Sequence, residues 1–133
     1  LKITSAFDKF DLSSGENSLF GTSTIDSQHF TAYGQKNSTG SATMSDPKII
    51  KMMNPMNYIG AKNTKTARYW RIRHGSIDSD TALAVPTIMA TKLQNLGYVV
   101  DFAIPWGVPH SGDYDLEELF EWTDTIFKKM SLT

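Results

Sequence analysis

Cysteine is absent from the 133 residues of this chain. Its absence excludes disulfide scaffolds, cysteine-ligated zinc, iron–sulfur clusters and thiol catalysis. The three histidines, His29, His74 and His110, lie far apart in the sequence and show no HExxH or similar spacing. The sequence therefore predicts no metal site.

Long hydrophobic runs and an excess of one charge are lacking as well. No apolar stretch approaches the roughly 18 residues that a membrane-spanning helix needs. The net charge of −1 removes the electrostatic argument for binding nucleic acid or an anionic membrane surface. The start of the chain has neither an initiator Met nor the apolar core of a signal peptide. We therefore expect the chain to be processed or cut from a longer protein, and its compartment stays open between bacterial cytoplasm and secretion.

The composition is that of a globular protein, with 40% hydrophobic and 20% charged residues. Its length suits one domain or a piece of one. Residues 1–45 are rich in Ser, Thr, Gly and Asn, and we interpret residues 13–17 and 35–41 as loops. So few aliphatic residues would hardly stabilise an independent domain. This half is therefore interpreted as part of a larger insertion whose partner surfaces lie elsewhere.

Regular structure is indicated more clearly further along the chain. Asp46 before Pro47 is typical of a helix start, and Pro55 ends that helix. Beyond residue 67 the patterns predict a strand, a helix, a second strand and a second helix, at residues 68–74, 83–95, 98–104 and 115–130. This order favours an α/β fold with parallel strands and a right-handed crossover. Because two strands do not make a stable parallel sheet, further strands are expected upstream or in another chain.

Acidic residues follow the first predicted strand, and a histidine follows the second. In α/β sheets, functional groups gather in loops at the carboxyl ends of strands, so Asp78, Asp80 and His110 are expected at one edge. An acid followed by a histidine matches the last two members of the α/β-hydrolase triad, Ser–Asp/Glu–His. No G-x-S-x-G motif occurs in the chain, so the serine nucleophile would have to come from outside it.

The roles of such a pair follow from its chemistry. His110 would take the proton from the serine and return it to the leaving alcohol, while Asp78 would accept the other ring N–H. Simpler interpretations exist, because an acidic residue after a strand often caps the next helix, and a lone histidine in a loop is often a surface residue. Together, in this order, the pair favours a triad. His74, at a strand end, is interpreted as a packed histidine.

Several motifs resemble the C-terminal part of bacterial tannases and tannase-like α/β-hydrolases. They are residues 69–75, 78–81, 105–106 and 109–116, and more loosely 14–17 and 54–59. The resemblance implies that residues 61–133 form the C-terminal β-α-β-α part of an α/β-hydrolase core. It also implies that residues 1–60 are the end of a lid domain inserted in that core.

The activity implied by the resemblance is cleavage of the galloyl esters and depsides of tannins through a serine acyl-enzyme, releasing gallic acid. Asp78 would be the triad acid and His110 the base, while Lys2, Glu16 and Asp80 would contact the ring hydroxyls. No metal or organic cofactor is implied. The partner is the missing N-terminal portion that carries the serine, and without it we expect this chain to be inactive and partly unfolded.

Other functions remain open from the residues alone. A feruloyl or general carboxylesterase of the same fold would need no trio of polar groups around a phenol ring. A non-catalytic remnant of the fold could bind a ligand or partner, because fold does not dictate function. A flavodoxin-like binding domain is disfavoured by the two strands and the lack of a phosphate loop.

Overall fold

The computed structural model describes residues 7–110, 112 and 114–131. These residues form two compact units. The first contains residues 7–66 together with 80–82, and the second contains residues 67–79, 83–110, 112 and 114–131.

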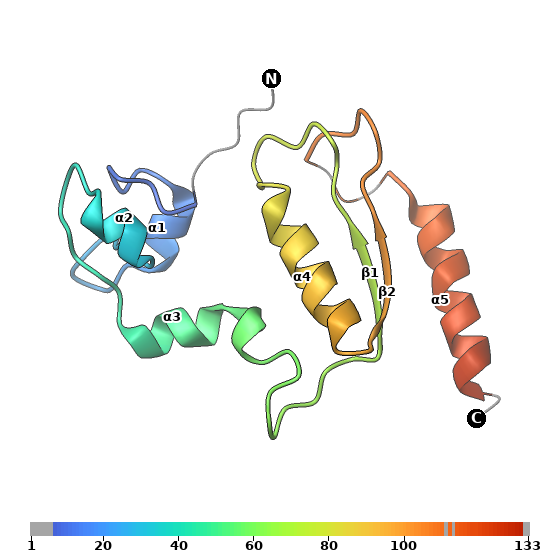
Figure 1. Cartoon of the computed structure of the whole chain (residues 1–133). Coiled ribbons are helices and arrows are strands. Elements are labelled where there is room, and N and C mark those ends of the chain that lie inside the picture. Colours follow the sequence, from blue (N-terminus) through green and yellow to red (C-terminus); the bar gives the residue numbers. More distant parts are fainter. Residues whose placement is uncertain (1–6, 111, 113, 132–133) are drawn as a thin grey trace. The chain divides into compact units, whose positions relative to one another are not determined.

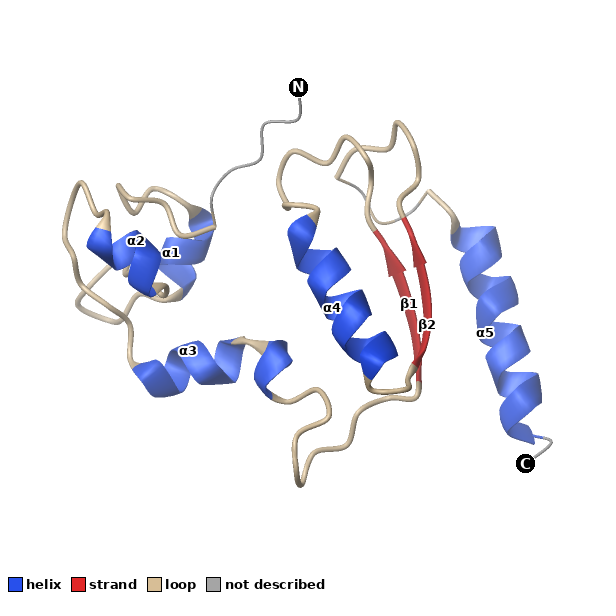
Figure 2. Ribbon diagram, viewed as in Figure 1, coloured by secondary structure: helices blue, strands red, loops and turns tan. Residues whose placement is uncertain are grey.

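The first unit consists of short helices joined by loops (Figures 1 and 2). Its elements are α1 (Gly15–Leu19), α2 (Ala32–Lys36), α3 (Pro47–Met53) and the 3₁₀ turn η1 (Pro55–Asn57). Side-chain caps start the three α-helices: Ser14, Thr31 and Asp46 each accept a hydrogen bond from a backbone N–H in the first turn. The helix at Pro47 was predicted, whereas α1 occupies residues interpreted as a loop. That interpretation was wrong because the Ser14 cap outweighs the low helix propensity of the segment that follows.

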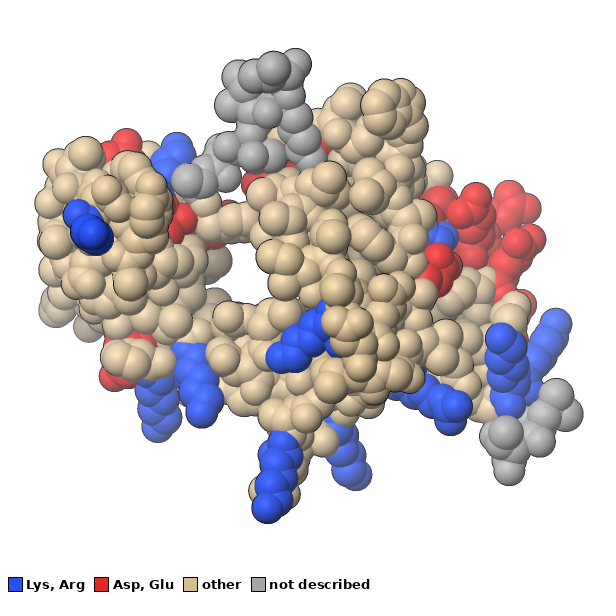
Figure 3. All heavy atoms as spheres, in the orientation of Figure 1, with Lys and Arg blue, Asp and Glu red and all other residues tan. Residues whose placement is uncertain are grey.

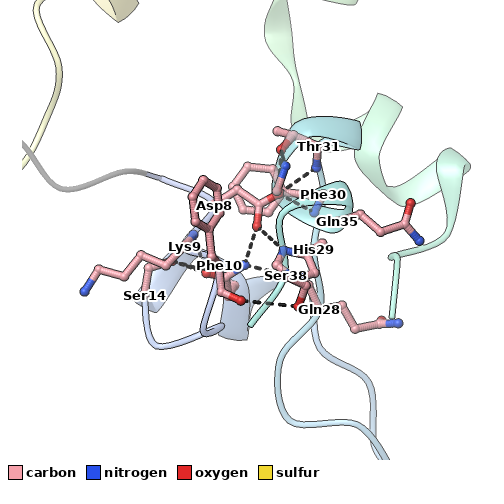
Figure 4. Close-up of polar contacts among 12 residues, drawn as sticks. Asp8, Lys9, Phe10, Ser14, Gln28, His29, Phe30, Thr31, Gln35 and Ser38 are labelled. Carbon is pink, nitrogen blue, oxygen red and sulfur yellow. Dashed lines mark hydrogen bonds and ion pairs between the residues drawn. The ribbon is translucent and has the colours of Figure 1, made fainter. Parts of the chain in front are cut away.

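A polar network forms the centre of the first unit (Figure 4). The Asp8 carboxylate accepts hydrogen bonds from His29 Nδ1 at 2.6 Å, from Asn17 Nδ2 at 2.8 Å and from the Thr31 hydroxyl at 2.7 Å. Burial raises the pKa of Asp8, but the bonds from Thr31, His29 and Asn17 outweigh it and bring the pKa to about 2. Gly34 packs directly on this carboxylate, where a Cβ atom would clash. Buried hydrogen bonds thus supply much of the order that few aliphatic side chains could give.

The second unit is a parallel two-stranded sheet with a helix on either side (Figure 1). Its elements in chain order are β1 (Tyr69–Arg73), α4 (Ala84–Asn95), β2 (Val99–Ala103) and α5 (Leu116–Ser131). The strands pair in register from Tyr69 opposite Val99 to Arg73 opposite Ala103. Leu93 of α4 is fully buried and forms the centre of a small apolar core. Order, direction and bounds agree with the sequence prediction within two residues, and the result is an α/β fold.

The turn between α4 and β2 shows why these bounds are predictable. Gly97 adopts φ +82°, a left-handed conformation that terminates a helix without steric cost only in glycine. Within the described residues, no helix is long and apolar enough to cross a membrane.

Candidate active site

Two loops follow the carboxyl ends of β1 and β2 and are hydrogen-bonded to each other. The Ser76 N–H donates to the Pro105 carbonyl at 3.0 Å, and the Ile77 N–H donates to the Val108 carbonyl at 3.2 Å. The Gly107 N–H in turn donates to the Ser76 hydroxyl at 2.8 Å. These bonds hold the two loops together at one edge of the sheet.

Gly75 is the point of closest approach between these loops. A Cβ atom at this position would clash with the carbonyl oxygen of Val108 and would lie 2.6 Å from that of Pro109. Both atoms belong to the backbone of the facing loop and cannot rotate away. The absence of a side chain at Gly75 is therefore what allows the loop carrying His110 to pack so closely.

Asp78 and His110 meet at this edge. His110 Nδ1 lies 3.0 Å from Asp78 Oδ2, within hydrogen-bond distance. The Asp78 side chain is 6% exposed, whereas that of His110 is 57% exposed. A further hydrogen bond, from the Asp78 N–H to the Gly75 carbonyl at 3.1 Å, fixes the backbone of the acid. The sequence predicted that these two side chains would meet, and the structure brings them together as a buried acid beneath an exposed imidazole.

His74 is a second imidazole beside the same carboxylate, and sequence reasoning missed this. Its Nδ1 atom lies 3.6 Å from Asp78 Oδ2, the oxygen that His110 also approaches. The residue is buried, as the sequence predicted, but it packs against the acid rather than only against the core. The missed signal was its position, since the residue directly after β1 lies at the carboxyl edge where Asp78 was expected.

Of the remaining predicted site residues, Asp80 lies beside the pair: one oxygen of its carboxylate, one of Asp78 and one ring nitrogen of His110 lie within 4.8 Å of one another. Asp80 is exposed, two residues beyond Asp78 in the same loop. Glu16 is on α1 and lines a cavity of about 350 Å³ within the first unit. Aromatic rings of Phe7, Phe20 and Phe30 also line this cavity, and the last two stack with centroids 4.3 Å apart. Lys2 lies outside the described residues.

An ion-pair network ties the far end of the His110 loop to the sheet. Asp115, the last residue before α5, accepts a hydrogen bond from Arg71 Nη2 at 2.6 Å. Arg73 forms a two-point contact with Asp101, at 3.0 and 2.8 Å, and its Nε lies 3.4 Å from Asp115. The bond from Arg71 lowers the pKa of Asp115 most strongly, and the bond from Arg73 does the same for Asp101. The loop is therefore anchored at both ends.

Charge is also ordered along α5. Figure 3 shows acidic side chains over the start of this helix and basic ones at its end. Glu117 and Glu118 lie in the first turn, and Lys128 and Lys129 lie in the last. This arrangement complements the helix dipole, as the sequence predicted.

Comparisons with known proteins return bacterial tannases among the solved structures. The tannase from Lactobacillus plantarum is 50% identical with a TM-score of 0.85, over 91% of this chain and 26% of that one. The tannase from Fusobacterium nucleatum is 55% identical with a TM-score of 0.81, over the same shares. A tannin acyl hydrolase in complex with ethyl gallate is 50% identical with a TM-score of 0.84, again over 91% and 26%. No protein-family model and no curated protein matches the chain.

The chain thus spans about a quarter of the length of the tannases that it matches. Identity of this order over nearly the whole chain, with the same backbone arrangement, confirms the resemblance to the C-terminal part of bacterial tannases.

Proposed function

Because this chain matches a C-terminal portion of bacterial tannases, we propose that it is the part of a serine ester hydrolase that supplies the acid and base of the catalytic triad. The observation that carries this proposal is the hydrogen bond between Asp78 and His110 at the carboxyl ends of two parallel strands. Residues 61–133 then belong to an α/β-hydrolase core, and residues 1–60 are the end of a lid domain inserted in it.

The geometry of the pair suits general acid–base catalysis. With Nδ1 directed at Asp78, Nε2 is the His110 ring nitrogen that would take the proton of the serine hydroxyl as the serine attacks the ester carbonyl. His110 then returns the proton to the leaving alcohol. Asp78 stays ionised, holds the ring in one tautomer and stabilises the imidazolium as it forms. Its burial strengthens this interaction because little water screens it.

The nucleophile belongs to the part of the protein outside this chain. The sequence holds no G-x-S-x-G motif, and in α/β-hydrolases the residue after that serine also supplies an oxyanion-hole N–H. We therefore expect the chain alone to be inactive and the complete protein to be active.

The substrate we propose is a galloyl ester or depside of a tannin. Structures that this chain matches are tannin acyl hydrolases in complex with ethyl gallate and with 3,4-dihydroxybenzoate. In this proposal Lys2, Glu16 and Asp80 contact the ring hydroxyls. Carboxylates accept strongly from phenolic O–H groups, and a site built on such bonds rejects rings that lack them. The exposure of Asp80 and the aromatic surroundings of Glu16 support these roles.

Hydrolysis of methyl gallate and methyl benzoate by the complete protein tests both parts of the proposal. We expect His110→Ala to lower kcat on both esters by about 10³-fold or more, because the base is lost. Asp80→Ala should lower kcat/KM for the gallate far more than for the benzoate. Wild-type rates in His110→Ala would refute the triad. An equal loss on both esters in Asp80→Ala would indicate a general carboxylesterase instead.

A further inference from the structure

We propose that His74 is a positioning residue of this site: it acts through Asp78, holding the carboxylate in the orientation that His110 needs. This inference rests on the proposed triad. It assigns a role to a residue that does not itself touch the reacting atoms.

The backbone places His74 firmly against the acid. The residue follows β1 directly, and its N–H donates to the Ala103 carbonyl at the end of β2, at 3.2 Å. Its side chain is 4% exposed and that of Asp78 is 6% exposed. The backbone of His74 is therefore held between the ends of the two strands, and its imidazole is buried beside Asp78.

Two imidazoles converge on one oxygen atom. His110 Nδ1 lies 3.0 Å from Asp78 Oδ2, and His74 Nδ1 lies 3.6 Å from the same atom. The longer distance exceeds a direct hydrogen bond. We assign the ring proton of His74 to Nδ1, so that its N–H dipole acts on the nearby carboxylate. A buried carboxylate needs such donors, because few water molecules compensate its charge.

The two histidines differ in exposure and hence in task. The His110 side chain is more than half exposed and can meet a substrate, while the His74 side chain is enclosed. A donor on the buried side reduces the freedom of the carboxylate to rotate away from His110. It also partly offsets the negative electrostatic potential that Asp78 produces at His110. Loss of the donor should therefore leave His110 more easily protonated and less well oriented.

Other ionisable groups nearby belong to the same loops and strands. They are Asp80 in the loop after β1, Tyr114 in the loop after β2, and the ion-pair residues Arg71, Arg73, Asp101 and Asp115. None of them is changed chemically when His74 is replaced. A change in pH dependence can therefore be attributed to the imidazole at position 74.

Asn and Leu have nearly the same shape and make a matched pair of substitutions at His74. The Asn amide places an N–H donor close to the position of Nδ1, whereas Leu places none. In the complete protein, we expect His74→Leu to lower kcat for methyl gallate by about tenfold or more, because His110 is then less well oriented toward the reacting atoms. KM should stay within about twofold, and the acidic limb of the kcat/KM profile should move to higher pH. His74→Asn should recover most of the rate and the wild-type pH profile.

Equal rates in His74→Leu and His74→Asn, or an unchanged acidic limb in His74→Leu, would overturn the positioning role. If the Leu variant does not fold, His74→Gln is used in its place, because the Gln amide lies one bond further from the backbone than the Asn amide. A Gln variant as active as the Asn variant would then overturn the positioning role. Asp78→Asn and His110→Ala are assayed in parallel. If these two variants are inactive while His74→Leu has the wild-type rate, only the positioning role is refuted. If Asp78→Asn and His110→Ala are fully active, the triad itself is refuted.

Discussion

Replacing Gly75 with Ala is the most direct test of how the two loops position the proposed catalytic pair, Asp78 and His110. The added Cβ atom would lie 2.6 Å from the Pro109 carbonyl oxygen, whereas a carbon–oxygen contact needs about 3.3 Å. The loops must therefore separate by about 0.7 Å or more. His110 follows Pro109 directly, so the same movement lengthens its 3.0 Å contact with Asp78 beyond hydrogen-bond range.

The expected cost can be estimated from that displacement. Misplacing a catalytic group by about 1 Å typically costs about 100-fold in rate, so we expect Gly75→Ala to lower kcat for methyl gallate by roughly 10- to 100-fold. Overpacking should destabilise the complete protein by about 1–3 kcal/mol, measured by denaturant unfolding. Gly112→Ala is the matched control, because it lies in the His110 loop with open space around its Cβ position. A wild-type kcat in Gly75→Ala would refute the reasoning.

Three further predictions concern stability. The Asp8 pKa falls from 3.8 to about 2 on folding, so its contribution of roughly 2 kcal/mol to the free energy of unfolding should be present above pH 4 and lost as the pH falls through 2. Asp8→Asn should flatten this pH dependence in unfolding experiments. An unchanged dependence of stability on pH in this variant would contradict the prediction. Asp115→Ala removes a partner of the buried Arg71 side chain and should lower the free energy of unfolding by about 3 kcal/mol. Glu118→Ala removes an exposed partner of the same arginine and should lower it by less than about 1 kcal/mol. Equal losses in the two variants would argue against Asp115 as the anchor of the His110 loop. Gly34→Ala should lower the melting temperature by several degrees because its Cβ meets the Asp8 carboxylate, and an unshifted melting curve would exclude this contact.

The second unit was predictable because its local signals agree with one another. Alternating residues in β1, a glycine stop after α4 and the charge order of α5 each indicate the element that forms. The meeting of Asp78 and His110 followed from topology alone, since adjacent parallel strands carry their next loops to one edge. The first unit was not predictable in the same way. Its organisation depends on Asp8 binding His29 and Thr31, more than 20 residues away, and no periodicity in the sequence reports such bonds.

His74 shows a different limit of sequence reasoning. A buried histidine at a strand end has the same pattern whether it packs in a core or faces a catalytic acid, and only the path of the following loop decides between the two. Here the bond from the Asp78 N–H to the Gly75 carbonyl turns the chain back, so the carboxylate returns to the imidazole four residues earlier. The turn after β1, and not the strand itself, therefore brings Asp78 next to His74.

Large apolar side chains are exposed along α5 in the second unit. Phe120, Phe127 and Met130 of α5 are 65%, 71% and 62% exposed, and α5 has no buried residue. A hollow between the start of β1 and the end of α5 adds further apolar surface around Trp122 and Ile126. Each such side chain would gain about 1.5–3 kcal/mol on burial, which is large beside the 5–15 kcal/mol that stabilises a typical domain. We therefore expect burial of α5 in the complete protein proposed above to rigidify this helix and, through Asp115, the His110 loop.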